Sequence, residues 1–139
     1  MKNLIICVAI LLAGLGAGAQ NSLVTHIAAT CPPSGADVTE LSDHSILIRY
    51  TQNDIRYRAF YDKNGTWLHT VASYGGTSLP ASVRGLIKTS WYNWNITYVD
   101  EVQTPGLSPV YRVQLKRNGR LVILRVSDEE MATEEELRD

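Results

Sequence analysis

The chain has few of the residues that build disulfide-rich scaffolds or metal sites. Its 139 residues include two cysteines, three histidines and one phenylalanine. Cys7 lies in an amino-terminal apolar segment that export would remove, so the mature chain keeps Cys31 alone and has no internal disulfide. We interpret Cys31 as a small buried side chain, with an intermolecular disulfide as the alternative.

Signals of catalysis are also missing. His26, His44 and His69 fall in an expected helix, loop and strand, without the spacing of metal ligands. Asp100 and Glu101 are neighbours in an expected strand, so their carboxylates should point to opposite faces and cannot act as a pair. No nucleophile-elbow, zincin or phosphate-loop motif occurs. We predict no catalytic residue, no metal site and no cofactor, and hence a protein that is not an enzyme.

Long apolar runs are absent after residue 19. Lys2 precedes an apolar run over residues 4–15, and Ala-Gly-Ala at 17–19 matches a signal-peptidase site. The run of about 12 residues is shorter than the roughly 20 that a membrane-spanning helix needs. We therefore predict a signal peptide over residues 1–19 that is cleaved near Ala19, a periplasmic or secreted protein, and no membrane insertion.

Charge is divided unevenly along the chain. Residues 20–127 hold eleven lysines and arginines against seven acidic residues, whereas residues 128–139 hold seven acidic residues and one arginine. A basic body would suit nucleic acid, but an exported protein rarely meets any, so we predict no nucleic-acid partner. We interpret the acidic tail, residues 128–139, as a charged segment that solvates the end of the chain. Ser-Asp-Glu-Glu and Thr-Glu-Glu-Glu match helix capping boxes, so the alternative is a short C-terminal helix.

The middle of the chain alternates between apolar and polar residues. Segments 45–52 and 54–62 have the period of half-buried strands, and the Asn-led dipeptides at 53–54 and 64–65 accept the positive φ of tight hairpins. Three antiparallel strands are therefore predicted over residues 45–73. Their inward face would hold Ile46, Ile48, Tyr50, Tyr57, Ala59 and Tyr61.

A helical period follows over residues 79–92. Val83, Leu86 and Ile87 lie at helical spacing, Pro80 suits the first turn, and Ser78 is the expected N-cap. Three more strands are predicted after this helix. They cover residues 95–103, 109–119 and 120–127, with turns at 105–106 and 118–119.

The two halves of the chain match each other. Residues 23–31 resemble 83–91, and the hairpin at 46–61 resembles that at 111–126. This predicts an α+β fold of two tandem helix-plus-antiparallel-strand units, about 21–73 and 79–126, within one domain at 20–127. The units would form one antiparallel sheet with the helices packed on one face.

Several motifs resemble a known family. Residues 60–70 read FYDKNGTWLHT, residues 79–87 read LPASVRGLI, and VDEVQTPG precedes VYRVQLKRNGRLVILRVS. Together they are similar to the PepSY-like exported proteins, also described as β-lactamase-inhibitor-protein-like (BLIP-like), over residues 21–127. The resemblance implies helices on one face of a sheet whose other face is open, as in the inhibitors that grip an enzyme with that face.

The chain departs from this family pattern in three places. Cys31-Pro32-Pro33 should shorten the first helix, and the ending VSDEE suggests a truncated final strand. The acidic tail is the third departure.

Strand alternation predicts which side chains would line the open face. Arginine mixed with aromatic and aliphatic groups is typical of protein-binding hot spots. Trp67, beside the Asn-Gly turn, either braces the hairpin or presents an edge for binding. The predicted binding residues are Arg49, Arg56, Arg58, Phe60, Trp67, Arg112, Lys116 and Arg125, with Gln114, Leu121 and Ile123 also outward.

These features favour an exported, non-enzymatic protein-binding module, with inhibitor-like action toward a periplasmic enzyme or peptidase as its most specific form. The expected partner is a protein of the cell envelope. The alternative is a self-associating envelope scaffold, with a homodimer covering the open face, or a small-ligand-binding protein without inhibitory action.

Overall fold

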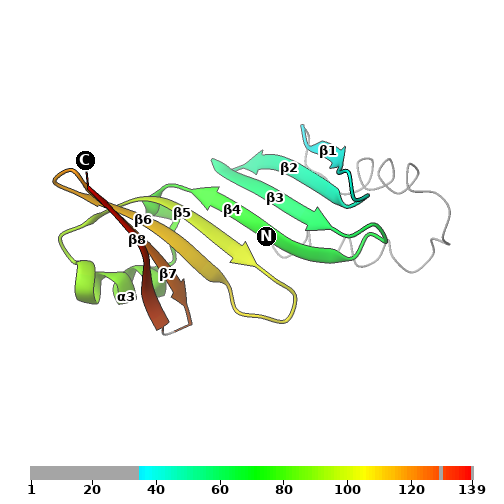
Figure 1. Cartoon of the computed structure of the whole chain (residues 1–139). Coiled ribbons are helices and arrows are strands. Elements are labelled where there is room, and N and C mark those ends of the chain that lie inside the picture. Colours follow the sequence, from blue (N-terminus) through cyan, green and yellow to red (C-terminus); the bar gives the residue numbers. More distant parts are fainter. Residues whose placement is uncertain (1–34, 129, 139) are drawn as a thin grey trace. The chain divides into compact units, whose positions relative to one another are not determined.

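The computed structural model describes residues 35–128 and 130–138. Within them lie eight strands, whose order in the sheet follows their order in the chain, together with one α-helix and one 3-10 turn (Figure 1). The chain divides into two compact units, Met1–Thr70 and Val71–Asp139, which are described separately. The elements are β1 (Asp37–Glu40), β2 (Ile46–Gln52), β3 (Ile55–Tyr61), β4 (Trp67–Tyr74), η1 (Gly76–Ser78), α3 (Ala81–Trp91), β5 (Asn95–Gln103), β6 (Val110–Arg117), β7 (Arg120–Ser127) and β8 (Glu130–Arg138).

The antiparallel sheet is confirmed, but the two tandem helix-plus-strand units are wrong. The described residues contain a single α-helix, α3, and the eight strands form one meander. The first expected helix, at 23–31, lies outside the described residues, as do Cys31 and the signal peptide. Strand alternation and Asn-led turns recur in any meander of hairpins, so their repetition does not require a repeated helix.

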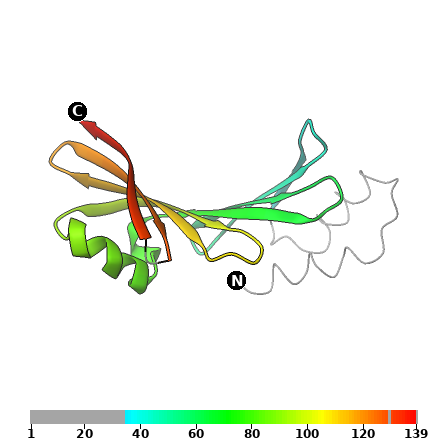
Figure 2. The same ribbon diagram turned by 60° about the horizontal axis from the view of Figure 1, so that its bottom comes forward.

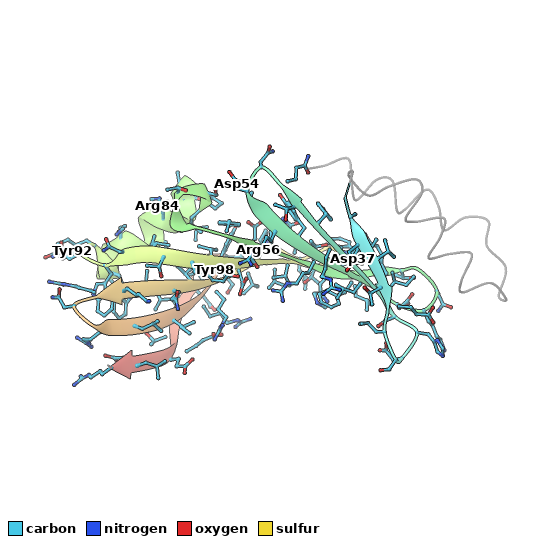
Figure 3. The ribbon with its side chains drawn as sticks, turned by 90° about the horizontal axis from the view of Figure 1, so that it is seen from above. Asp37, Asp54, Arg56, Arg84, Tyr92 and Tyr98 are labelled. Carbon is cyan, nitrogen blue, oxygen red and sulfur yellow. The ribbon has the colours of Figure 1, made fainter. Side chains whose placement is uncertain are left out.

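What does repeat is one hairpin geometry. In β2–β3 the two-residue turn is Asn53-Asp54, with φ of 52° and 63°, and in β6–β7 it is Asn118-Gly119, with φ of 48° and 73°. Positive φ at both central residues matches the right-handed twist of the flanking strands. Gln52 pairs with Ile55 in the first hairpin, and Arg117 pairs with Arg120 in the second. The two registers therefore coincide, 65 residues apart. Figure 3 shows Asp54 at the tip of the first hairpin.

The loop between β3 and β4 is built around Asp62. Its Oδ1 accepts hydrogen bonds from the N–H groups of Asn64 and Thr66, each at 2.8 Å. The N–H of Gly65 donates to the Asp62 carbonyl at 2.9 Å, and Gly65 has a φ of 81°. Of the Asn-Gly pair in this loop, only glycine takes the left-handed conformation, as in a type I turn followed by a glycine bulge.

Helix α3 covers one side of the β5–β8 strands (Figure 2). Its N-cap is Pro80 rather than the predicted Ser78. A guanidinium N–H of Arg84 donates to the Gly76 carbonyl of η1, which ties the first turns of the helix to the preceding turn. A Cβ at Gly76 would lie 2.3 Å from the Ile96 carbonyl oxygen of β5, so only glycine fits this close approach.

Apolar side chains fill the interior of each unit as the alternation predicted. In unit 1 the six side chains predicted to face inward are at most 8% exposed. In unit 2 the fully buried side chains come from α3 and from β5 to β7. These are Ile87, Val99, Val113, Leu115, Val122, Leu124 and Val126.

The acidic tail forms a strand, which overturns the alternative of a C-terminal helix. β8 pairs antiparallel with β7 from Ser127↔Glu130 to Arg120↔Arg138, with a bulge beside Ile123 and Leu124 (Figure 1). The sheet therefore continues beyond residue 127, where the last predicted strand ended. A capping box describes only local hydrogen bonds, whereas the exposed edge of β7 offers a continuous ladder of backbone partners.

Candidate binding surfaces

The outward side chains of β2 and β3 in unit 1 are those that the alternation predicted. Arg49 lies opposite Arg58, Thr51 opposite Arg56, and Leu47 opposite Phe60. The three arginines are exposed and Phe60 is half-buried. We call Arg49, Arg56, Arg58, Phe60 and His69 the unit 1 outer face.

An aromatic pair marks this outer face. The Phe60 ring stacks on the His69 imidazole of β4, with centroids 4.5 Å apart and planes inclined by 21°. The contact settles which face of β4 carries His69, which the sequence left open. Because a stacked pair on an exposed sheet face combines apolar area with a polar edge, it can anchor a protein partner.

Arg49 of this face forms an ion pair with Asp37 of β1. Its Nη2 donates to Asp37 Oδ2 at 2.8 Å and to Thr39 Oγ1 at 3.3 Å. Both ion-pair side chains are more than half exposed, so solvent weakens the pair and it holds Arg49 only loosely.

Trp67 braces the start of β4. Its indole Nε1 donates to Thr70 Oγ1 at 2.9 Å, and the ring is half-buried. Of the two roles proposed for Trp67, the hydrogen bond to Thr70 supports bracing of the hairpin. Participation in a binding surface stays a prediction.

The outward face of unit 2 carries the remaining predicted residues. Arg112, Lys116 and Arg125 are exposed there, and Arg112 lies opposite both Asp100 and Arg125. Ile123 was expected to be exposed but is 9% exposed. Strand β8 supplies the neighbour that the alternation could not show, because Glu135 lies beside Ile123 and Gln114 flanks it on the other side.

Glutamates of β8 engage the arginines of unit 2. Arg112 Nε lies 3.1 Å from Glu134 Oε2, and its Nη2 lies 3.9 Å from Glu135 Oε2. On the opposite face Arg120 donates to Glu136. This hydrogen bond, and then the arginine's charge, holds the pKa of Glu136 below its ordinary value.

Two adjoining depressions lie at the tip of the β6–β7 hairpin. One has a volume of about 320 Å³ and the other about 220 Å³. The Arg120 guanidinium carbon lies 5.5 Å from the centroid of Trp94, which also meets Trp91 edge-to-face at 5.1 Å. This cationic tip was not predicted, although the run Lys-Arg-Asn-Gly-Arg is its signal in the sequence. The lining residues are Trp94, Asn95, Lys116, Arg117, Asn118, Gly119, Arg120 and Leu121.

Asp100 and Glu101 point to opposite faces, as predicted. Asp100 accepts a hydrogen bond from Ser73 Oγ at 2.5 Å. Glu101 accepts one from the Tyr74 hydroxyl at 2.7 Å and another from Gln103 Nε2 at 2.9 Å. Both carboxylates therefore serve to join neighbouring strands.

The histidines lie in separate surroundings. His44 Nδ1 lies 2.7 Å from Glu40 Oε1, His69 stacks on Phe60, and His26 lies outside the described residues. In the part of the chain that the structure describes, no three His, Cys, Asp or Glu side chains cluster as metal ligands. No helix in that part is both long and apolar enough to cross a membrane.

Comparison with known proteins places the fold. No family model and no curated protein matches the chain. A BLIP-like protein of Bacteroides fragilis matches with a TM-score of 0.62 and 18% identity, covering 91% of each chain. A DUF2874 family protein of Bacteroides ovatus matches with a TM-score of 0.60 and 12% identity, over 87% of this chain and 89% of that one. A protein of Bacteroides eggerthii described as a candidate periplasmic protein gives 0.59 and 12%, over 91% and 90%.

The resemblance to BLIP-like proteins is thus confirmed for the fold, which DUF2874 proteins share. Identities of this size establish a common fold and leave function to be argued from the surfaces themselves.

Proposed function

We propose that the protein is an exported, non-enzymatic binding module that holds a cell-envelope protein against its unit 1 outer face. The observation that carries the proposal is the Phe60–His69 stack, which lies on a sheet face with exposed arginines. Aromatic and arginine side chains together supply most of the binding energy in typical protein interfaces.

The charge of the outer face specifies the partner's chemistry. Arg49, Arg56 and Arg58 lie on adjacent strands, and Asp37 is the carboxylate paired with Arg49. A matching partner presents carboxylates around an apolar or aromatic centre. Such complementarity steers association and selects the orientation of docking.

The unit 1 outer face is preferred over the outward face of unit 2 for a physical reason. The unit 1 outer face carries the Phe60–His69 stack, which supplies an aromatic centre for an interface. Arg112, Lys116 and Arg125 stay predicted binding residues of secondary weight.

Export and inhibition are further parts of the proposal. Export rests on the apolar run and Ala-Gly-Ala site of residues 1–19, and a structural neighbour is described as a candidate periplasmic protein. Inhibitor-like action on an envelope enzyme or peptidase is the specific form that the BLIP-like fold suggests. It requires the partner to be an enzyme.

Alanine substitution of Arg58 and Phe60 tests the proposal. Capture of partners from an envelope extract of the native host should fall about tenfold or more, because truncation of a hot-spot residue costs roughly 2 kcal/mol. Lys63→Ala, which removes an exposed cation at the hairpin tip, is the matched control and should leave capture unchanged.

Thermal unfolding and solution mass complete the test. If the melting temperature of the double variant falls by more than a few degrees, these side chains are structural and the proposal fails. An obligate dimer that protects Arg56, Arg58 and Phe60 from modification would favour the scaffold alternative instead.

A further inference from the structure

Strand β8 is held to the sheet by little apolar contact. Of its residues, Met131 is half-buried and the rest that the structure describes are exposed. In contrast, Val122, Leu124 and Val126 of the neighbouring β7 are at most 1% exposed. Since burial of apolar area supplies most folding free energy, β8 contributes little to the core.

Ion pairs hold β8 from both sides of the sheet. Glu134 and Glu135 reach Arg112, which belongs to β6 and extends past β7. Glu136 accepts a hydrogen bond from Arg120 of β7. The bulge beside Ile123 and Leu124 inserts Glu134 as an extra residue, so three consecutive glutamates can meet two arginines on opposite faces.

A charged edge strand has an ordinary use, which is to prevent edge-to-edge aggregation. That use explains why β8 carries charge. Protection from aggregation does not explain why Arg112 and Arg120 lie within reach of consecutive carboxylates of a strand paired with β7. Two guanidinium groups so placed can form charge-assisted hydrogen bonds with the carboxylates of an extended acidic segment.

From this arrangement we propose that the edge of β7, together with Arg112 and Arg120, is a docking site for an extended acidic segment of another protein, and that β8 occupies this site until it is exchanged. We call it the acidic-strand site. The incoming segment would add to β7 through backbone hydrogen bonds and place its carboxylates on the two arginines, as β8 does. This proposal uses unit 2 and does not depend on the unit 1 outer face.

Exchange must overcome the tethering of β8. A segment joined to its own site by a short turn has an effective concentration on the order of millimolar or above. A free acidic segment therefore binds visibly only where the ion pairs of β8 are weakened. The test has to weaken the tethered strand without altering the arginines.

The test uses the full chain with Glu134, Glu135 and Glu136 replaced by glutamine. The probe is a labelled peptide of residues 130–138, EMATEEELR, and the matched control is the same peptide with glutamine at those three positions. The acidic peptide should bind the triple-glutamine chain about tenfold more tightly than the control peptide does, and about tenfold more tightly than it binds the unaltered chain, as expected for two or three exposed ion pairs.

Additional variants locate the recognition. Adding Arg112→Gln or Arg120→Gln to the triple-glutamine chain should reduce the preference for the acidic peptide, and adding both should abolish it. Adding Arg125→Gln should preserve it, because Arg125 lies opposite Ala132, which offers no carboxylate. Equal binding of the two peptides, or binding of neither, overturns the proposal.

Hydrogen exchange of the unaltered chain gives an independent measurement that needs no variant. An exchangeable strand must open more readily than the strand beneath it, so β8 amides should exchange at least about tenfold faster than those of β7 that face β6. Equal protection of the two strands contradicts an exchangeable β8.

Discussion

The hairpins β2–β3 and β6–β7 have the same register and the same kind of turn, yet different side chains fill them. Tyr50 of the first hairpin corresponds to Leu115 of the second, 65 residues further along the chain. The first inner face is therefore rich in tyrosine, with Tyr50 stacked on Tyr57 at 4.8 Å, whereas the second is aliphatic apart from Tyr111. Turn and alternation set the backbone, and the choice of side chains gives each hairpin its own chemistry.

The edge strands beside the two hairpins also differ. Asp37 of the four-residue β1 forms an ion pair with Arg49 beside the first hairpin, whereas three consecutive glutamates of the nine-residue β8 meet arginines of the second. Arg49 of the first hairpin thus meets one aspartate of a short edge strand, whereas Arg112 and Arg120 of the second meet three glutamates of a longer one. The edge strand therefore sets how many carboxylates reach the arginines of each hairpin.

The largest effect on stability is expected from a substitution on the inner face of the β6–β7 hairpin. Leu124 is fully buried, and its counterpart in the first hairpin is Ala59. Leu124→Ala should lower the free energy of unfolding by about 2–5 kcal/mol, because it leaves a cavity that the rigid sheet fills only partly. Urea denaturation measures the loss. Leu107→Ala, at a position 71% exposed, should change it by less than about 0.5 kcal/mol.

A smaller effect is expected at the turns. Gly119 has a φ of 73°, and its counterpart Asp54 adopts 63°. Gly119→Ala should cost about 1–2 kcal/mol, because a Cβ is strained in the left-handed region. Gly119→Asp should cost less, since aspartate tolerates that region. Thermal unfolding compares the two, and equal losses would contradict a shared turn geometry.

Alkaline pH should distinguish the tyrosine-rich inner face. Burial, and then the charges of Tyr57 and Tyr61, raises the pKa of Tyr50 above its ordinary value of about 10. A raised pKa means that its contribution to stability is complete below pH 10 and is lost as pH rises toward the folded value. Tyr50→Phe should reduce this alkaline loss in denaturation curves, whereas Tyr92→Phe, at an exposed position just beyond α3 (Figure 3), should not.

The smallest expected effect concerns Glu136. Its lowered pKa means that its contribution is present above the ordinary glutamate value and is lost as pH falls through the folded pKa. Arg120→Gln should raise the pKa of Glu136 toward that ordinary value, as measured by NMR titration of the carboxyl group. Arg125→Gln, on the opposite face, should leave the pKa of Glu136 unchanged. If both variants shift this pKa equally, the contact with Arg120 is not what lowers it.

Local features of the sequence were sufficient for most of the described strands. The turns at 53–54 and 118–119 and the buried positions of β2, β3, β6 and β7 follow from alternation and from residues that accept positive φ. Helix α3 follows from its spacing, although its N-cap does not.

Contacts between distant segments account for what was missed. The capping boxes in residues 127–136 favoured a helix, but the unpaired edge of β7 and the arginines at 112 and 120 favour a strand. Ile123 is buried by a neighbour that no alternation within β7 can show. The face of His69 depended on the register across the Asp62 loop, which became visible only through its contact with Phe60.

The central claim is that the unit 1 outer face holds a protein partner, and the most direct test compares equivalent positions of the two hairpins. Phe60 of the first corresponds to Arg125 of the second. Partner capture should fall about tenfold for Phe60→Ala and stay within about twofold for Arg125→Ala, at unchanged melting temperature. Equal losses for the two variants, or full capture by Phe60→Ala, would contradict the claim.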